Sequence, residues 1–483
     1  MPKVGMVSLG CPKNLVDSEV MLGILARHGF ELTPSAADAE VIIVNTCSFI
    51  EPAQRESIDT ILEMAELKKT GSAKRLVVAG CLVERFRKEI LEDIPEVDYV
   101  IGTNELERVI EACAQESAGR EAKTPAEPYL YHDFTPRVLS TPSYSAYLKI
   151  AEGCDHPCSF CVIPQMRGKF RSRRFESVIR EAENLASQGV REITIIGQDT
   201  TSYGEDLGIR DGLAMLLRQL GGIPDLVWTR FLYCYPNRLN DALIAAIAET
   251  PKICKYFDIP LQHASGPVLK LMRRGSGASR FLKMLEKIRG EIPTASIRTS
   301  FIVGFPGETE DDFKVLLDFV EAAEFDHLGV FLYSNEDSSA SFSLPDQVAS
   351  RVAIRRQKTL LGLQRKISRR KLKRKVGQTY PLLVEGRSEE TDLLFTGRLE
   401  SQAPEIDGRV FVNDFVGDEP RPGDFRWATV TDSSDYDLIA RLETKSFAAR
   451  VISLPRRVPG PKMIQIQPAG APAMDTGHAV PHL

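Results

Sequence analysis

Hydrophobic runs alternate with amphipathic segments over about the first 112 residues. Strand-like apolar runs occupy residues 4–9, 41–45, 76–79 and 99–101, and helical periodicity follows each of them, at 15–28, 53–68, from 82 and from 105. Continuous apolar strands separated by helices are typical of a parallel sheet covered on both faces. We therefore expect an α/β, three-layer parallel-sheet domain over residues 3–114.

A second alternating block follows a polar stretch rich in Ala, Glu, Pro and Ser at 115–143, which we interpret as a linker. Its strand patterns lie at 146–151, 192–197, 227–234, 256–260, 296–303 and 327–333, with helical patterns between them, such as 177–187 and 310–323. Six such units predict a central partial (β/α)6 barrel over 144–370. Its chemistry would lie at the carboxyl ends of the strands.

The pattern changes again after residue 377. Short alternating segments at 379–384, 393–398, 409–412 and 426–431 predict a small antiparallel β-barrel over 373–442. Acidic residues outnumber basic ones in this segment, which suits a basic protein partner. The tail at 445–483 is rich in Pro, and we expect it to be disordered.

Composition and the first residues indicate the kind of cellular compartment in which we expect the chain to lie. Hydrophobic residues make up 43% of the 483 residues, but no apolar run is long enough to span a membrane. The first residues lack a signal-peptide pattern, so we expect a cytoplasmic, reducing location. In such a compartment the nine cysteines are better explained as metal ligands or buried hydrophobic residues than as disulfides.

Three cysteines lie in one loop directly after the first barrel strand. Cys154, Cys158 and Cys161 are too close in sequence for a disulfide framework, and Gly153 and Pro157 let the loop fold back. Short cysteine spacings are typical of iron-sulfur sites. Three protein ligands would leave one iron of a four-iron cluster open to a small molecule.

Three other cysteines each follow a strand of the first domain. Cys11, Cys47 and Cys81 are far apart in sequence, but the carboxyl ends of parallel strands meet at one sheet edge. This predicts a second metal site. The alternative is that each is a small buried hydrophobic residue, which is how we interpret the cysteines at 113, 234 and 254.

A cationic helix is predicted at 351–375, a segment that contains no Asp or Glu. A charge run is usually a solvated face, but one this one-sided also suits phosphate. The sequence leaves RNA contact through this helix open.

The motifs resemble a known family. Cys-x3-Cys-x2-Cys at 154–161, with Phe160 before the last thiol, resembles the signature of radical S-adenosylmethionine enzymes. With the three-cysteine first domain and a TRAM-like β-barrel, the chain is similar to the methylthiotransferases over about residues 3–442. The runs at 8–19, 262–265 and 344–347 resemble the RimO branch, whereas the tRNA-modifying branch typically has Gln-Met-Asn after the first cysteine. The loop at 333–339 departs from the family pattern.

The resemblance implies a function and its cofactors. The enzyme would add a methylthio group to the β-carbon of an aspartate in the basic, decoding-centre protein of the small ribosomal subunit. It would use S-adenosylmethionine and two 4Fe-4S clusters, one on Cys154, Cys158 and Cys161 and an auxiliary one on Cys11, Cys47 and Cys81.

The resemblance also implies smaller roles. Gln198 and Asp199 would hold polar groups of S-adenosylmethionine, because Asp199 matches a motif position that contacts the amine in this superfamily. Phe160 would pack near the adenine or anchor the loop. A flavodoxin or ferredoxin would donate electrons, and we expect a monomer.

Two alternatives remain open at this point. A tRNA adenosine methylthiotransferase would suit the cationic helix. A non-catalytic, zinc-binding RNA- or ribosome-interaction protein would use the clustered thiols differently, although structural zinc usually takes four protein ligands and each set here offers three.

Overall fold

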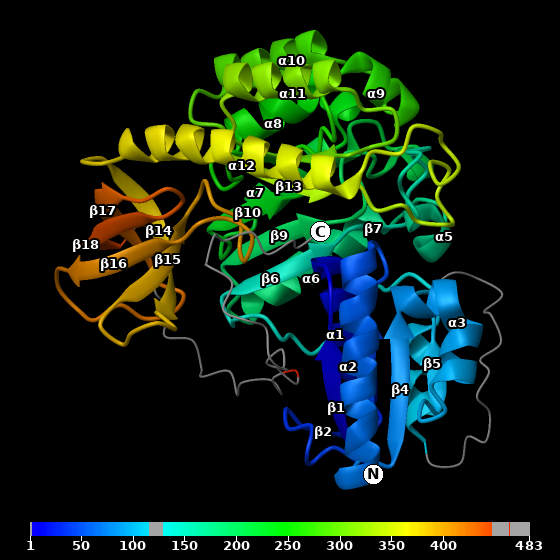
Figure 1. Cartoon of the computed structure of the whole chain (residues 1–483). Coiled ribbons are helices and arrows are strands. Elements are labelled where there is room, and N and C mark those ends of the chain that lie inside the picture. The colour runs from blue at the N-terminus through cyan, green and yellow to red at the C-terminus, as the bar shows by residue number, and fades with distance from the viewer. Residues whose placement is uncertain (1, 115–128, 447–462, 464–483) are drawn as a thin grey trace.

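Three packed domains make up the computed structural model, which describes residues 2–114, 129–446 and 463 (Figure 1). The N-terminal domain (blue) and the C-terminal β-barrel (orange) both pack on a central α/β domain. The predicted fold class is confirmed, while the exact domain boundaries stay a prediction. No helix in the described ranges is long and apolar enough to cross a membrane.

The N-terminal domain is a parallel five-stranded sheet with the order β2-β1-β3-β4-β5. Its strands are β1 (Lys3–Ser8), β2 (Glu31–Leu32), β3 (Val41–Thr46), β4 (Arg75–Gly80) and β5 (Tyr99–Ile101). Its helices are α1 (Pro12–Arg27), α2 (Glu51–Thr70), α3 (Cys81–Asp93) and α4 (Val109–Cys113). Alternate side chains of the strands pack on α1 and α4 on one face and on α2 and α3 on the other. The short edge strand β2 was not predicted.

The central domain has six parallel strands in chain order, as predicted. Two three-stranded sheets, β10-β9-β6 and β11-β12-β13, are joined by a bridge between Thr229 and Ile253. The strands are β6 (Ser145–Lys149), β9 (Glu192–Ile196), β10 (Trp228–Phe231), β11 (Tyr256–Asp258), β12 (Ser296–Val303) and β13 (His327–Leu332). The helices are α5 (Ile163–Arg167), α6 (Phe175–Ser187), α7 (Gly212–Gly221), α8 (Asp241–Glu249), α9 (Gly266–Leu271), α10 (Ala278–Glu291), α11 (Glu310–Ala323) and α12 (Ser350–Lys373). A short antiparallel pair, β7 (Ala151–Glu152) with β8 (Arg171–Ser172), was not predicted.

Part of the predicted linker is built into the domain interface. Residues 115–128 lie outside the described residues, but Tyr131 is buried and Arg137 pairs with Glu19 of α1 at 2.6 Å. Gly23 of α1 permits this packing, because a Cβ there would lie 2.3 Å from the carbonyl of Pro136. A glycine inside a helix costs about 1 kcal/mol relative to alanine, and here it allows the close contact.

The C-terminal domain is a closed five-stranded barrel with the order β14-β15-β16-β18-β17. The strands are β14 (Thr379–Arg387), β15 (Phe395–Leu399), β16 (Val410–Phe415), β17 (Phe425–Ser433) and β18 (Leu438–Ser446). The prediction was wrong in two respects, because β18 was missed and it pairs in parallel with β16. The first two residues of the predicted tail belong to β18, and 447–462 and 464–483 lie outside the described residues.

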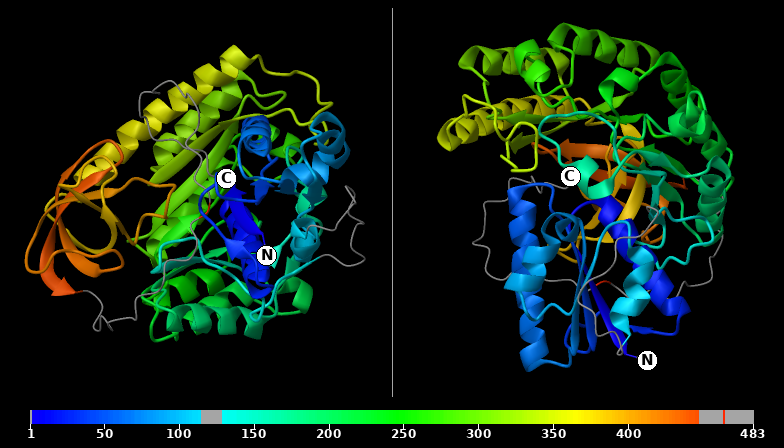
Figure 2. Two further views of the ribbon diagram at one scale, coloured as in Figure 1. Left: turned by 90° about the horizontal axis from the view of Figure 1, so that it is seen from below. Right: turned by 90° about the vertical axis from the view of Figure 1, so that its right-hand side faces the viewer.

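Buried contacts join the β-barrel to the central domain. Arg398 of β15 pairs with Glu192 of β9 at 2.6 Å, and both side chains are at most 3% exposed. Phe425 packs edge-on against Trp228 of β10, with ring centroids 4.9 Å apart. In the left view of Figure 2, α12 (yellow) leads from the central domain to this barrel.

The loop after β13 docks on the N-terminal domain. This is the segment at 333–339 that departs from the family pattern. Glu336 pairs with Arg85 of α3 at 2.8 Å and accepts a hydrogen bond from Gln54 of α2 at 2.8 Å. The unusual residues of this chain therefore contribute to the contact between its first two domains.

Candidate active site

The first set of thiols lies in the loop between β7 and α5. The loop turns at Gly153, which has φ +77° and approaches Lys169 so closely that a Cβ would lie 2.1 Å from its carbonyl oxygen. Only glycine satisfies both requirements. Cys154, Cys158 and Cys161 are free and half-buried.

These thiols lie within electrostatic reach of one another. Burial raises the pKa of Cys161 to about 12, and the charge of Cys158 adds to this effect. Burial also raises the pKa of Cys154 to about 11, again with a contribution from Cys158. Since the thiolate is the metal-binding form, metal binding here would release protons.

The second set meets at the carboxyl edge of the N-terminal sheet, as predicted. Cys11 follows β1, Cys47 follows β3 and Cys81 opens α3. Gly10, with φ +82°, lies so close that a Cβ would be 2.6 Å from Cys47 Cβ. Burial, together with the charges of Cys81 and Cys11, raises the pKa of Cys47 to about 12.

Cys11 differs from the other two. Burial opposes its ionisation, but the positive charges of Lys13 and Arg167 outweigh burial and lower the pKa of its thiol. A thiolate is therefore favoured at Cys11 over the other two positions. Whether either set holds a cluster stays a prediction, but the donor chemistry fits one.

The described residues contain no group of three or more His, Cys, Asp or Glu side chains arranged around a single metal ion. In a four-iron cluster each thiolate binds its own iron, so the ligands lie farther apart than around one ion. Three thiols without a fourth ligand suit such a cluster and argue against structural zinc.

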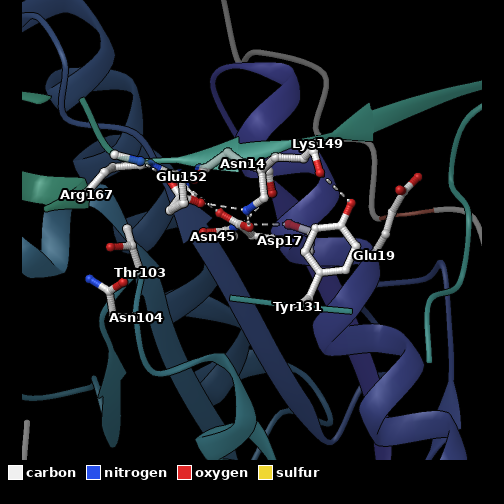
Figure 3. Close-up of polar contacts among 12 residues, drawn as sticks. Asn14, Asp17, Glu19, Asn45, Thr103, Asn104, Tyr131, Lys149, Glu152 and Arg167 are labelled. Carbon is white, nitrogen blue, oxygen red and sulfur yellow. Dashed lines mark hydrogen bonds and ion pairs between the residues drawn. The ribbon is translucent and has the colours of Figure 1, made fainter. Parts of the chain in front are cut away.

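A buried polar network joins α1 to β6, β7 and α5 (Figure 3). Arg167, the last residue of α5, donates to Asp17 of α1 at 2.8 Å, to Glu152 of β7 at 3.2 Å and to Cys81 Sγ at 3.4 Å. Lys149 of β6 pairs with both Asp17 and Glu152. This network was not predicted, and its signal in the sequence was the polar residues of α1 within a buried helix.

The two predicted cofactor contacts, Gln198 and Asp199, differ in how far their polar atoms are already hydrogen-bonded. Gln198 donates to Glu152 Oε1 at 2.8 Å, and its own Oε1 is buried without a partner. Asp199 is already engaged, because it accepts from Ser202 Oγ at 2.6 Å and from the backbone N–H of Thr201 at 2.9 Å. The orphaned Gln198 oxygen is the better candidate for a ligand contact.

Asp199 also holds His156, the histidine between the first cysteines. The distance from His156 Nε2 to Asp199 Oδ2 is 2.6 Å, and the ring stacks on Tyr235 with centroids 3.7 Å apart. Burial opposes ionisation of Asp199, but hydrogen bonds from His156 and its neighbours lower its pKa overall. His156 is therefore positioned by Asp199.

A second guanidinium was also missed. Arg274 Nη1 lies 3.5 Å from Cys158 Sγ, and its guanidinium lies over the Tyr235 ring, 4.5 Å from the centroid. Hydrogen bonds to cysteine sulfurs tune iron-sulfur potentials. Phe160 packs partly buried against the core of the central domain.

Three family models match the chain in the order of its domains. They are the Uncharacterized protein family UPF0004 at 3–102, the Radical SAM superfamily at 148–320 and the TRAM domain at 376–442. Among solved structures, the radical S-adenosylmethionine methyltransferase TsrM from Kitasatospora setae has a similar fold. It is 16% identical with a TM-score of 0.52, and the match covers 71% of this chain and 77% of that one.

Curated relatives match almost the whole chain. The protein named ribosomal protein uS12 methylthiotransferase RimO of Solibacter usitatus is 56% identical, over 96% of this chain and 99% of the relative. The protein of the same name from Koribacter versatilis is 54% identical, over 91% of this chain and 96% of the relative. The chain therefore belongs to the RimO family of radical S-adenosylmethionine methylthiotransferases, and it is a transferase.

Proposed function

We propose that this enzyme adds a methylthio group to the β-carbon of an aspartate in ribosomal protein uS12. The observation that carries the proposal is the 56% identity to a relative of that name over 96% of the chain. The acidic C-terminal barrel supports it, because a basic ribosomal protein is the complementary partner.

S-adenosylmethionine and iron-sulfur clusters follow from the family, and we propose two 4Fe-4S clusters. Cys154, Cys158 and Cys161 would hold one, and Cys11, Cys47 and Cys81 the other. When bound, these groups supply the radical chemistry and the sulfur that side chains lack.

The chain's own residues keep the two sites together and dry. Arg167, Lys149, Asp17 and Glu152 are all at most 3% exposed, and they fix α1 to the strands that lead into the first loop. Gln198 would orient the methionine end of S-adenosylmethionine through its free oxygen. Phe160 would line or anchor the same loop.

The remaining partners are part of the same proposal. A flavodoxin or ferredoxin would supply electrons to a monomer in the cytoplasm, where ribosomal proteins are available. RNA contact through α12 is favoured by one observation, the exposed cations Lys366, Lys373 and Arg374 near the end of that helix.

Iron content tests the ligand assignment. We expect about eight irons per chain in anaerobically reconstituted protein and about half that number in Cys154→Ala and in Cys11→Ala. Cys113→Ala is the matched control, because Cys113 is buried in the N-terminal core away from both sets. Full iron in either ligand variant would refute its assignment.

Mass spectrometry tests the substrate. In a deletion strain we expect uS12 to lose its methylthio adduct and tRNA nucleosides to keep theirs. Loss from tRNA alone would instead support the tRNA methylthiotransferase.

A further inference from the structure

The first cysteine loop is held at its centre by the end of α9. Ser159 lies between the second and third cysteines of the loop and is only 2% exposed. Its N–H donates to Met272 O at 3.1 Å, and its hydroxyl donates to Leu271 O at 2.7 Å. The last turn of α9 therefore fixes the position of the loop relative to the chain that follows this helix.

The chain leaves α9 in a Schellman motif that fixes the backbone of Arg274. Arg273 has φ +56°, in the left-handed region that ends such a helix. Its N–H donates to Lys270 O at 3.0 Å, and the N–H of Arg274 donates to Leu269 O at 2.9 Å. Arg274 is thereby held two residues beyond the Met272 carbonyl that binds the cysteine loop.

The guanidinium of Arg274 is buried against the loop, and the residue is 8% exposed. Its Nη1 lies 3.5 Å from Cys158 Sγ, its Nη2 donates to Pro260 O at 2.7 Å, and the group lies over the Tyr235 ring. Its Nε is buried and has no hydrogen-bond partner among the described residues. A buried donor of this kind indicates a partner that the chain itself does not supply.

No Asp or Glu carboxylate pairs with Arg274 in the part of the chain that the structure describes. The two carboxylates that act on Cys154 have other partners. Asp155 Oδ1 accepts from the N–H of Phe170 at 3.0 Å, and Asp199 lies 2.6 Å from His156 Nε2. A buried charge without a counter-charge is costly, so we expect an anionic group beside Arg274 in the loaded protein.

The arginine at the second set of thiols is compensated. Arg167 lies 3.4 Å from Cys81 Sγ, and it also pairs with Asp17 and Glu152. Two carboxylates of the chain therefore share the charge of Arg167. The charge of Arg274 is left for the group that the first set of thiols holds.

We infer that Arg274 is a positioning residue, which acts through Cys158 to favour the one-electron-reduced state of the first cluster. The inference rests on the proposed cluster at Cys154, Cys158 and Cys161. A 4Fe-4S cluster held by three thiolates carries negative charge, and the electron from the proposed flavodoxin or ferredoxin adds to it. A buried cation that donates to a cysteine sulfur stabilises the reduced form more than the oxidised form, and so raises the reduction potential.

A redox titration of the full-length, anaerobically reconstituted protein tests this role. The electron paramagnetic resonance signal of the reduced protein is followed without S-adenosylmethionine, in the wild type and in a Cys11→Ala background that identifies the signal of the first cluster. We expect Arg274→Gln to lower the equilibrium constant for reduction by about 10- to 100-fold, the usual effect of a hydrogen bond to a charged group, or about 60–120 mV for one electron. Arg274→Lys keeps the charge and should lower it less.

Arg273→Gln is the matched control, because Arg273 is the neighbouring residue and is exposed. The same charge removed from solvent should leave the potential unchanged. A second measurement needs no change at Arg274. In the Cys11→Ala background, with arginine labelled by a nitrogen isotope, hyperfine spectroscopy of the reduced cluster should detect an arginine nitrogen. This signal tests the contact even if Arg274→Gln loses its iron.

The outcomes separate the cluster from the cofactor. If Arg274→Gln weakens binding of S-adenosylmethionine and leaves the potential unchanged, Arg274 serves the cofactor and the inference is overturned. A reduced first cluster without arginine nitrogen coupling also overturns it. Neither measurement uses uS12, so failure of this inference is distinguishable from failure of the proposed function.

Discussion

Gly153 and Gly208 have nearly the same backbone conformation, with φ +77° and +71°. Their surroundings differ, because a Cβ at Gly153 would lie 2.1 Å from Lys169 O, whereas a Cβ at Gly208 would meet nothing within 4 Å. Alanine would carry similar backbone strain at both positions. A difference between the two variants would therefore measure the effect of the close approach at Gly153.

Gly153→Ala is expected to open the first cysteine loop. The added methyl group must push the Lys169 carbonyl away, so the thiols move apart and about half of the reconstituted iron is lost. Gly208→Ala carries the same torsional strain in open space and should keep its iron. Equal iron in both variants, measured per chain, would show that loop closure does not depend on this close approach.

At the residue scale, the sequence predicted the placement of the six cysteines and missed their arginine partners. Spacing alone brings Cys154, Cys158 and Cys161 together, and strand ends bring the other three together. Arg167 is 86 residues from Cys81, and Arg274 is 116 residues from Cys158. No local pattern encodes such distant contacts, because they depend on how the domains dock.

At the element scale, carboxylates from other elements neutralise part of the positive charge of α12. Arg370 pairs with Glu324 and Lys371 with Asp326, both from the chain after α11. Lys366, Lys373 and Arg374 are exposed and have no recorded carboxylate partner among the described residues. Together with Arg369 and Arg370 they line an open cleft of about 490 Å³.

These three cations are expected to contact RNA phosphate. Replacing Lys366, Lys373 and Arg374 with alanine should weaken binding to small-subunit particles and flatten its salt dependence. The slope of log K against log salt should fall by about 0.7–0.9 for each phosphate that the protein no longer neutralises. The matched control replaces Arg280, Lys283 and Lys314, which are exposed on α10 and α11. An unchanged slope in the α12 variant would rule out RNA binding by these cations.

The elements missed from sequence have physical reasons. Leu438, Ile439 and Ala440 in β18 do not alternate with polar residues, and the strand pairs on both sides with register shifts. The predicted linker looked polar, and its packing depends on one glycine of α1 that admits the Pro136 carbonyl. Hydrophobic periodicity alone reveals neither strand β18 nor the packing of the predicted linker.

At the scale of the whole molecule, a buried ion pair docks the C-terminal barrel. Burial opposes ionisation of Glu192, but Arg398 and Arg230 more than offset this and lower its pKa to about 2. The folded-state pKa lies below the unfolded value, so the stabilisation is complete above about pH 4.5 and is lost as pH falls toward 2.

We therefore expect barrel docking to weaken in acid by about 2 kcal/mol between pH 6 and pH 3. Trp228 reports it, because its ring packs on Phe425 of the barrel. Urea titrations followed by Trp228 fluorescence, in a Trp427→Phe background, should show this loss. The Glu192→Gln variant should be less stable than the wild-type protein at neutral pH. It should also lose the part of the pH dependence that ionisation of Glu192 contributes. Identical pH profiles would assign the acid sensitivity to other groups.

Arg167 also has a consequence for how the chain matures. The N-terminal sheet is complete at Ile101, yet Cys81 contacts a guanidinium at position 167. At a synthesis rate of about 5–20 residues per second, the intervening chain takes about 3–13 seconds to emerge. During that interval the sheet can fold while the surroundings of Cys81 are incomplete. The thiols made first in the chain are therefore the ones that must wait for a later segment before their environment is finished.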